Sequence, residues 1–181
     1  MNTRLGALLL LAIAASTIPS WASTLPPSCG DENTVLDVTA HKNGVVTTVP
    51  EAGMAKVYFI ENADKDALPV TTRVGIDGMW VGANKGSSYF GYTVPPGEHH
   101  VCVDWLLDRR YIKDAPQFDL FTAEAGKVYY FEVRVEWKPH EYAPGKLSPG
   151  GDMDLELRPV NEDQGKYMVF SSKLSTSTQK K

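Results

Sequence analysis

The sequence predicts an all-β fold, a small antiparallel β-sandwich, and three observations support this prediction. From Ala55 onward, short runs of β-branched and aromatic residues alternate with turn residues at spacings of roughly 8–15 positions, which is typical of sandwiches and barrels. The turn sequences Asp77-Gly78 and Pro95-Pro96-Gly97 stand between such runs. The 181 residues, 43% of them hydrophobic, suffice to bury one core in a single domain.

Residues 1–22 have the features of a secretory signal peptide. Arg4 precedes an apolar run from Leu5 to Ala15, which is shorter than the about 20 residues that a membrane span needs. Ser20 and Ala22 then place small residues at the positions that a signal peptidase reads, so we expect cleavage after Ala22. The sequence therefore predicts an exported protein of the periplasm or cell envelope, without a transmembrane span.

Residues 23–54 are predicted as an irregular N-terminal arm, and residues 55–160 as the β-sandwich domain. Lys56–Ile60 is apolar on both faces, which favours a central strand. The Asp77-Gly78 pair predicts a hairpin between Thr72–Ile76 and Met79–Gly82, because both turn positions of a type I′ turn require residues that tolerate positive φ. Pro95-Pro96-Gly97 predicts that the chain doubles back after the next strand.

The remaining strands follow from alternation of apolar and polar residues, and the longest of them is Lys127–Trp137. In it, Glu132, Arg134 and Glu136 share one face, which we expect to be solvated. Residues 161–181 are predicted as a short helix, in which Gly165 lowers helix propensity, followed by a polar and frayed tail. The other predicted strands are Ser87–Val94, Glu98–Trp105, Gln117–Ala123 and Met153–Arg158.

The order of these features resembles the bacterial DUF2846 family over about residues 55–157. The resemblance implies a β-sandwich of the carboxypeptidase-regulatory-like or Ig-like kind, in a secreted or lipid-anchored envelope domain with no established reaction. It implies no catalytic residue. The motifs that carry it are Ala55–Ile60, Ile76-Asp77-Gly78, Tyr89-Phe90, Pro95-Pro96-Gly97-Glu98-His99 and Glu124–Tyr130.

Composition excludes several functional classes. The formal net charge of −4 and a pI near 5.5 leave no basic surplus for neutralising phosphates, so nucleic-acid binding is not expected. Two cysteines and four histidines are too few for zinc-finger, iron–sulfur or disulfide-dense scaffolds.

The two cysteines, Cys29 and Cys102, are expected to form a disulfide in an oxidising compartment. Cys102 falls on the polar face of its strand, so this bond would fasten the N-terminal arm across the outside of the sheet. The alternatives are two free thiols, or a lipidated Cys29 with a buried Cys102. Pro26 and Pro27 argue against lipidation, because a lipobox has an aliphatic residue and small residues at these positions.

Candidate chemistry elsewhere is weak. His100, Cys102 and Asp104 project from one strand face, but a strand spans about 13 Å from i to i+4, far more than zinc ligands allow. His99 is interpreted as a satisfied core histidine and Asp77 as a turn residue. The sequence contains no G-x-S-x-G elbow and no H-E-x-x-H helix. We therefore expect no metal, no cofactor and no catalytic residues.

Aromatic residues are the remaining candidates for recognition. Most are interpreted as core, whereas Trp80, beside the hairpin turn, and Tyr142, in a loop rich in proline and glycine, are predicted to be exposed. The expected function is that of a non-catalytic, envelope-associated module that binds an envelope protein or a glycan. A carbohydrate-binding surface is the first alternative, and a hydrolase without a recognisable motif is the second.

Overall fold

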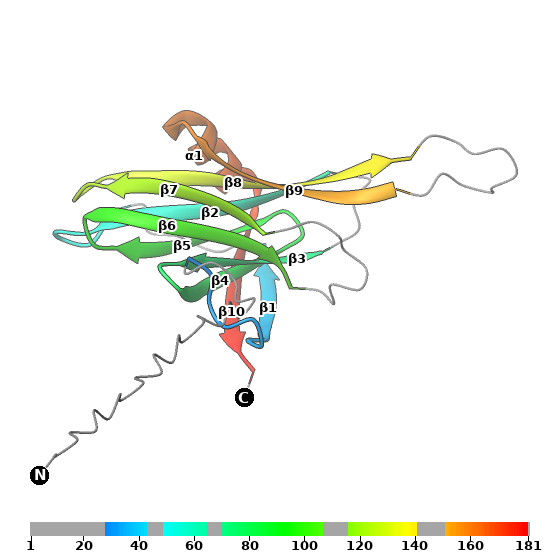
Figure 1. Cartoon of the computed structure of the whole chain (residues 1–181). Helices are drawn as coiled ribbons and strands as arrows, with labels where there is room; N and C mark the ends of the chain where they lie inside the picture. Colours follow the sequence, from blue (N-terminus) through cyan, green and yellow to red (C-terminus); the bar gives the residue numbers. More distant parts are fainter. Residues whose placement is uncertain (1–27, 43–48, 65–69, 107–115, 141–150, 181) are drawn as a thin grey trace, which may run out of the picture.

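The computed structural model describes residues 28–42, 49–64, 70–106, 116–140 and 151–180, and its course is shown in Figure 1. The predicted signal peptide lies outside the described residues. The elements are β1 (Leu36–His41), β2 (Ala55–Ala63), β3 (Thr71–Ile76), β4 (Met79–Lys85), β5 (Ser88–Val94), β6 (Gly97–Trp105), β7 (Gln117–Ala123), β8 (Val128–Pro139), β9 (Gly151–Val160), α1 (Glu162–Ser171) and β10 (Lys173–Gln179).

The described strands form two sheets, which confirms the predicted all-β sandwich. One sheet has the order β1-β10-β5-β2-β8-β9 and the other the order β4-β3-β6-β7. Antiparallel pairing predominates. Two pairs are parallel, which the sequence did not predict: β2 pairs with β8, and β10 pairs with β5. Strand β2 lies between β5 and β8, and its residues from Val57 to Glu61 are all buried, so the central position predicted for it is confirmed.

The two turn sequences play different parts. Asp77 (φ 49°) and Gly78 (φ 86°) form the tight turn between β3 and β4, as predicted. Pro95 and Pro96 stand before Gly97 (φ 139°), where the chain leaves β5 in the six-stranded sheet and enters β6 in the four-stranded sheet. The predicted reversal is therefore a corner between sheets, because β5 and β6 do not pair.

The main core lies between the two sheets and is built around aromatic rings. The Phe59 ring has its centroid 5.5 Å from that of Phe90 and 5.6 Å from that of Phe131, and the Phe121 ring contacts Phe131 edge-on at 5.3 Å. Such offset and edge contacts add to the stability that burial provides.

Helix α1 covers the outer face of the six-stranded sheet, where it lies against Tyr58, Tyr89 and Tyr130 (Figure 1). Gly165 lowers helix propensity, yet its place is dictated by packing. A Cβ atom there would lie 2.2 Å from Cγ of Tyr130. The helix can therefore approach the sheet closely only with glycine at this position.

The expectations of an irregular arm and a frayed tail are both wrong in part. The arm contains β1 and the tail contains β10, and the two pair antiparallel from Leu36 opposite Gln179 to His41 opposite Leu174. In Figure 1 this ribbon runs across the direction of the other strands. In β1 apolar and polar residues alternate, a short pattern that the sequence shows at Val35–Thr39. The residues of β10 are mostly small and polar, so this strand gains stability from backbone hydrogen bonds rather than from an apolar face that periodicity could reveal.

Candidate functional site

The best-developed candidate site lies on the outer face of the four-stranded sheet, where residues 28–34 of the arm cross it. Cys29 and Cys102 form the predicted disulfide, with their Cα atoms 5.2 Å apart and both side chains buried. Cys102 projects from the outer face of β6, as predicted, and its neighbour on β3 is Gly75. A Cβ atom on Gly75 would lie 2.8 Å from the Ser28 carbonyl oxygen, so the arm needs glycine beneath it.

An arginine buried under the arm ties this segment to the sheet. The Arg73 guanidinium pairs with Asp104 at 2.8 Å, and both side chains are almost fully buried. Its other terminal nitrogen donates to the carbonyl oxygens of Glu32 and Thr34 at 3.3 and 3.1 Å. One arginine thus neutralises a buried carboxylate and also supplies hydrogen bonds that the arm backbone would otherwise lack.

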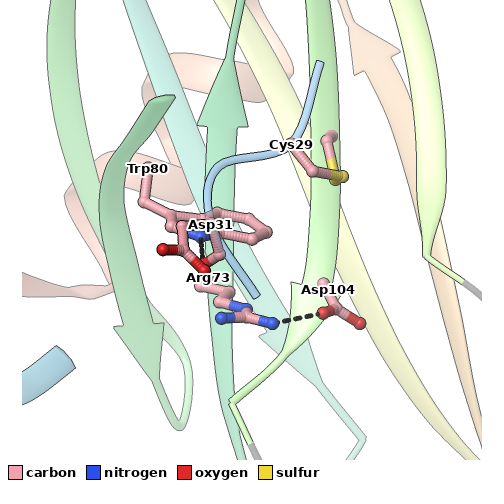
Figure 2. The surroundings of a disulfide bond; sticks show 6 residues. Cys29, Asp31, Arg73, Trp80 and Asp104 are labelled. Atoms are coloured by element: carbon pink, nitrogen blue, oxygen red, sulfur yellow. Dashed lines mark hydrogen bonds and ion pairs between the residues drawn. A yellow bond between two sulfur atoms is a disulfide. The ribbon is translucent and has the colours of Figure 1, made fainter. Parts of the chain in front are cut away.

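Trp80 completes this arrangement from β4, as Figure 2 shows. The Arg73 guanidinium lies 4.1 Å from the ring centroid, a cation–π contact. The indole Nε1 donates to the Asp31 carbonyl oxygen at 2.8 Å. A Cβ atom on Gly30 would lie 2.4 Å from the ring, so the arm also packs directly against the indole. Trp80 is half-buried rather than exposed, because the arm uses one face and the polar edge of its ring.

A groove of about 430 Å³ runs beside Trp80. Consecutive residues from Gly78 to Gly82 form one wall, and residues of the arm, β1 and β10 form the other. Met79, 61% exposed, lies at this wall. The residues that line the other wall are Gly30, Asp31, Thr34, Leu36, Ser177 and Gln179.

Strand β4 is an edge strand, and its backbone faces this groove. Ile76 and Met79 flank the two-residue turn, so they are the hydrogen-bonded pair, and Trp80 opposite Gly75 is the next, non-bonded pair. The N–H and C=O of Trp80 therefore point away from β3, toward the groove. A register shift between Val74 and Gly75 adds one residue to β4 at Val81, so Ala83 opposite Arg73 is again a non-bonded pair. Its carbonyl points away from β3, and there the Ser175 hydroxyl donates to it at 2.7 Å.

His99 is a satisfied core histidine, as predicted. Its Nδ1 lies 2.6 Å from the Asp77 carboxylate and its Nε2 lies 2.8 Å from the Pro95 carbonyl oxygen. Partial burial alone would raise the pKa of Asp77, but the hydrogen bonds from His99 and from the His100 amide lower it below its usual value. Because both ring nitrogens face acceptors, His99 joins the hairpin turn to the sheet corner and offers no free nitrogen for proton transfer.

The three residues considered as metal ligands on β6, namely His100, Cys102 and Asp104, do not converge on one point. Cys102 is in the disulfide, Asp104 is paired with Arg73, and the His100 side chain is exposed. Within the described ranges, no three His, Cys, Asp or Glu side chains gather as metal ligands would.

The expectation that Glu132 is solvated is wrong. Its side chain is 1% exposed, because Asn62 on β2 donates to one oxygen at 2.6 Å and Arg158 on β9 to the other at 2.6 Å. Alternation within β8 correctly places Glu132 on the outer face. Alternation within β8 carries no information about Asn62 and Arg158, whose side chains cover this carboxylate from the neighbouring strands.

Of the two aromatic candidates, the structure brings only Trp80 to a site, since Tyr142 lies outside the described residues. Sequence reasoning did not identify Arg73, nor Asp104 as its partner. An arginine in the middle of the apolar run Thr72–Ile76 and an aspartate in the run Val101–Trp105 were the available signals. Two lone charges in adjacent strands are the expected signature of a buried ion pair.

Comparisons with known proteins leave the family open. No family model matches the chain, and neither the curated proteins nor the solved structures include a match. The resemblance to the DUF2846 family stays a prediction. In the part of the chain that the structure describes, no helix is both long and apolar enough to span a membrane.

Proposed function

We propose that this protein is an exported, non-catalytic module of the cell envelope, and that it binds an extended segment of a partner protein in the groove along β4. The observation that carries the proposal is the juxtaposition of that groove with the outward-facing N–H and C=O of Trp80. An extended peptide can add to such an edge by backbone hydrogen bonds, while its side chains enter adjacent pockets.

The groove is prepared for binding because its main side chain is held in place. Trp80 is fixed by the arm at Gly30, by the hydrogen bond to Asp31 and by the Arg73 guanidinium. A rigid aromatic wall loses little conformational entropy when a ligand arrives. The disulfide of Cys29 with Cys102 fixes the arm against the sheet, and the arm in turn fixes the Trp80 ring.

The partner's chemistry follows from the two walls. Met79 and Leu36 offer apolar contact, whereas Ser177 and Gln179 offer donors and acceptors on the facing wall. A segment with one apolar side chain and neighbouring polar residues fits this distribution. The predicted signal peptide supports an envelope location, and the disulfide suits an oxidising compartment.

Site-specific photo-crosslinking tests this proposal in the cell. A benzophenone amino acid at Met79 is expected to form a cross-link that mass spectrometry assigns to one contiguous segment of one envelope protein. The matched control carries the same group at Glu124, an exposed residue outside the groove. Equal cross-linking at both positions, or scatter over unrelated segments, would contradict a specific groove.

The segment so identified is then synthesised and titrated into the ¹⁵N-labelled protein. The Trp80 amide should shift and become protected from hydrogen exchange, because strand addition gives it an acceptor. Binding that leaves this amide unprotected would reject strand addition while leaving the groove as the site.

A second candidate ligand is a glycan, because the Trp80 ring stands beside the polar residues Asp31, Ser177 and Gln179. Saccharides bind by stacking on an aromatic ring and by hydrogen bonds to such side chains. Titration with peptidoglycan fragments while Trp80 fluorescence is monitored tests this candidate. Loss of the response in Trp80→Ala would favour it, and no response in the native protein would reject it.

A further inference from the structure

Of the residues that line the groove, only Asp31 carries a formal charge. Two cations near this end of the arm have other partners. Arg73 pairs with Asp104 at 2.8 Å. Lys180, just beyond β10, pairs with Asp37 at 2.7 Å. The groove wall that the structure describes therefore has one carboxylate and no cation of its own.

The Asp31 carboxylate is held in a fixed position. Its Oδ1 accepts hydrogen bonds from the backbone and side-chain nitrogens of Asn33 at 2.9 and 3.1 Å. The carbonyl oxygen of the same residue accepts the indole hydrogen bond of Trp80 at 2.8 Å, and the disulfide at Cys29 lies two residues before it. An ionised carboxylate has about four acceptor positions, so these bonds leave it able to bind a cation. Because the group is already ordered, little conformational entropy is lost when a cation binds.

The geometry of strand addition brings one partner side chain to this carboxylate. Residues directly opposite one another in neighbouring strands present their side chains on the same face of a sheet, with Cβ atoms about 5 Å apart. The Trp80 ring points to the outer face, where the arm and Asp31 lie, as Figure 2 shows. The partner residue opposite Trp80 therefore places its side chain beside the indole and within reach of Asp31.

We propose that the groove selects a segment with lysine or arginine opposite Trp80, and that Asp31 determines this specificity. The inference rests on the proposed function, because it requires that an extended segment pairs with β4. A lysine or arginine can lay its aliphatic stem along the indole while its charged end bonds to the carboxylate. An acidic residue at the same position would face a fixed negative charge, so the groove also discriminates by repulsion.

The partner residue next to this cation contacts a different part of the groove. Met79 is opposite Ile76, whose side chain lies in the core between the sheets, so Met79 faces the other way from Trp80. The partner residue beside the cation alternates in the same manner and contacts Met79, which is apolar and largely exposed. The segment class is therefore a basic residue with an apolar residue beside it.

Selection of random linear peptides displayed on phage tests the inference with the oxidised, exported protein. Only enriched peptides that shift the Trp80 amide resonance are counted, because these bind at β4. The native protein should enrich peptides in which lysine or arginine stands beside an apolar residue, and Asp31→Lys should instead enrich aspartate or glutamate. Groove-binding peptides without a basic residue would overturn this inference and leave the proposed function standing. If no peptide shifts the Trp80 amide, both proposals are overturned.

The affinity of one enriched peptide then isolates the ion pair. Asp31→Asn keeps an acceptor for Asn33 but removes the charge, and it should weaken binding about fivefold at low ionic strength. This difference should disappear in about 1 M salt, where charges are screened within about 3 Å. Glu32→Gln, the matched control, removes the same charge from an exposed residue outside the groove lining and should bind like the native protein. Equal weakening in both variants would overturn the role of Asp31.

A change in the peptide makes the same test without altering the protein. Replacing the lysine or arginine of the peptide by glutamine should weaken binding to the native protein about fivefold, and it should not change binding to Asp31→Asn. Unchanged binding to the native protein would overturn the inference, whether or not the Asp31 variants fold.

Discussion

Replacing Glu61 by glutamine is expected to remove most of the loss of stability that the protein suffers between mildly acidic and neutral pH. The side chain is fully buried between the sheets, and burial raises the pKa of its carboxyl to about 7. In the unfolded chain the same group titrates near its ordinary value of 4.5. Between these two pH values the folded state holds a proton that the unfolded state has released, so the free energy of unfolding falls as the pH rises.

The size of this effect follows from the two pKa values. Each pH unit between about 4.5 and about 7 lowers the free energy of unfolding by about 1.4 kcal/mol, which amounts to about 3 kcal/mol in all. Above pH 7 the loss is complete and the curve flattens. Glutamine has nearly the same shape and can accept the Thr72 hydrogen bond, but it does not titrate, so the variant lacks this slope.

Urea unfolding of the oxidised protein at pH 4.5, 5.5, 6.5 and 7.5 measures the effect, and the quantity of interest is the difference between native protein and Glu61→Gln at each pH. Glu124→Gln, at an exposed turn position, is the matched control and should follow the native curve. Parallel curves for the native protein and Glu61→Gln would refute the reasoning, because they would mean that the carboxyl titrates normally in the folded state.

Three further predictions concern the packing around the sheets. A variant with both Cys29 and Cys102 replaced by alanine should lose about 4 kcal/mol of stability, because the disulfide closes a long loop in the unfolded chain, and urea unfolding measures this loss. Gly165→Ala should lower the melting temperature although alanine favours helices, because its methyl group would meet the Tyr130 ring; a rise would contradict the close approach. Arg158→Gln should cost roughly 2 kcal/mol, since it leaves a buried carboxylate without its cation, and an unchanged unfolding midpoint would count against that ion pair.

The features that depend on local chemistry could be predicted from the sequence. Asp77-Gly78 forms its turn because few other residues tolerate two positive φ angles in succession. The alternation in Glu98–Trp105 placed Cys102 on the outer face of the sheet, and therefore predicted that the disulfide fastens the arm there. His99 was correctly interpreted as a core residue because it alternates with valines.

The features that depend on which strands become neighbours could not be predicted in this way. Glu132 is buried by side chains from β2 and β9, and no pattern within its own strand indicates them. The exposure of Trp80 was overestimated for the same reason, because residues 30 and 31 cover its ring from far along the chain. The small polar residues of β10 form a strand only because β1 supplies the backbone partners.

The pairing of β1 with β10 also sets the order in which the groove beside Trp80 is completed. Residues 36–41 are made long before residues 174–179, with which they pair. Cys29 can meet Cys102 without β10, whereas one wall of the groove contains Ser177 and Gln179 and is complete only when β10 has paired. A chain interrupted between β9 and β10 would contain both cysteines and most of the core strands but no complete groove. The proposed recognition surface therefore forms later than the core, and a copy that lacks β10 would not compete for the partner.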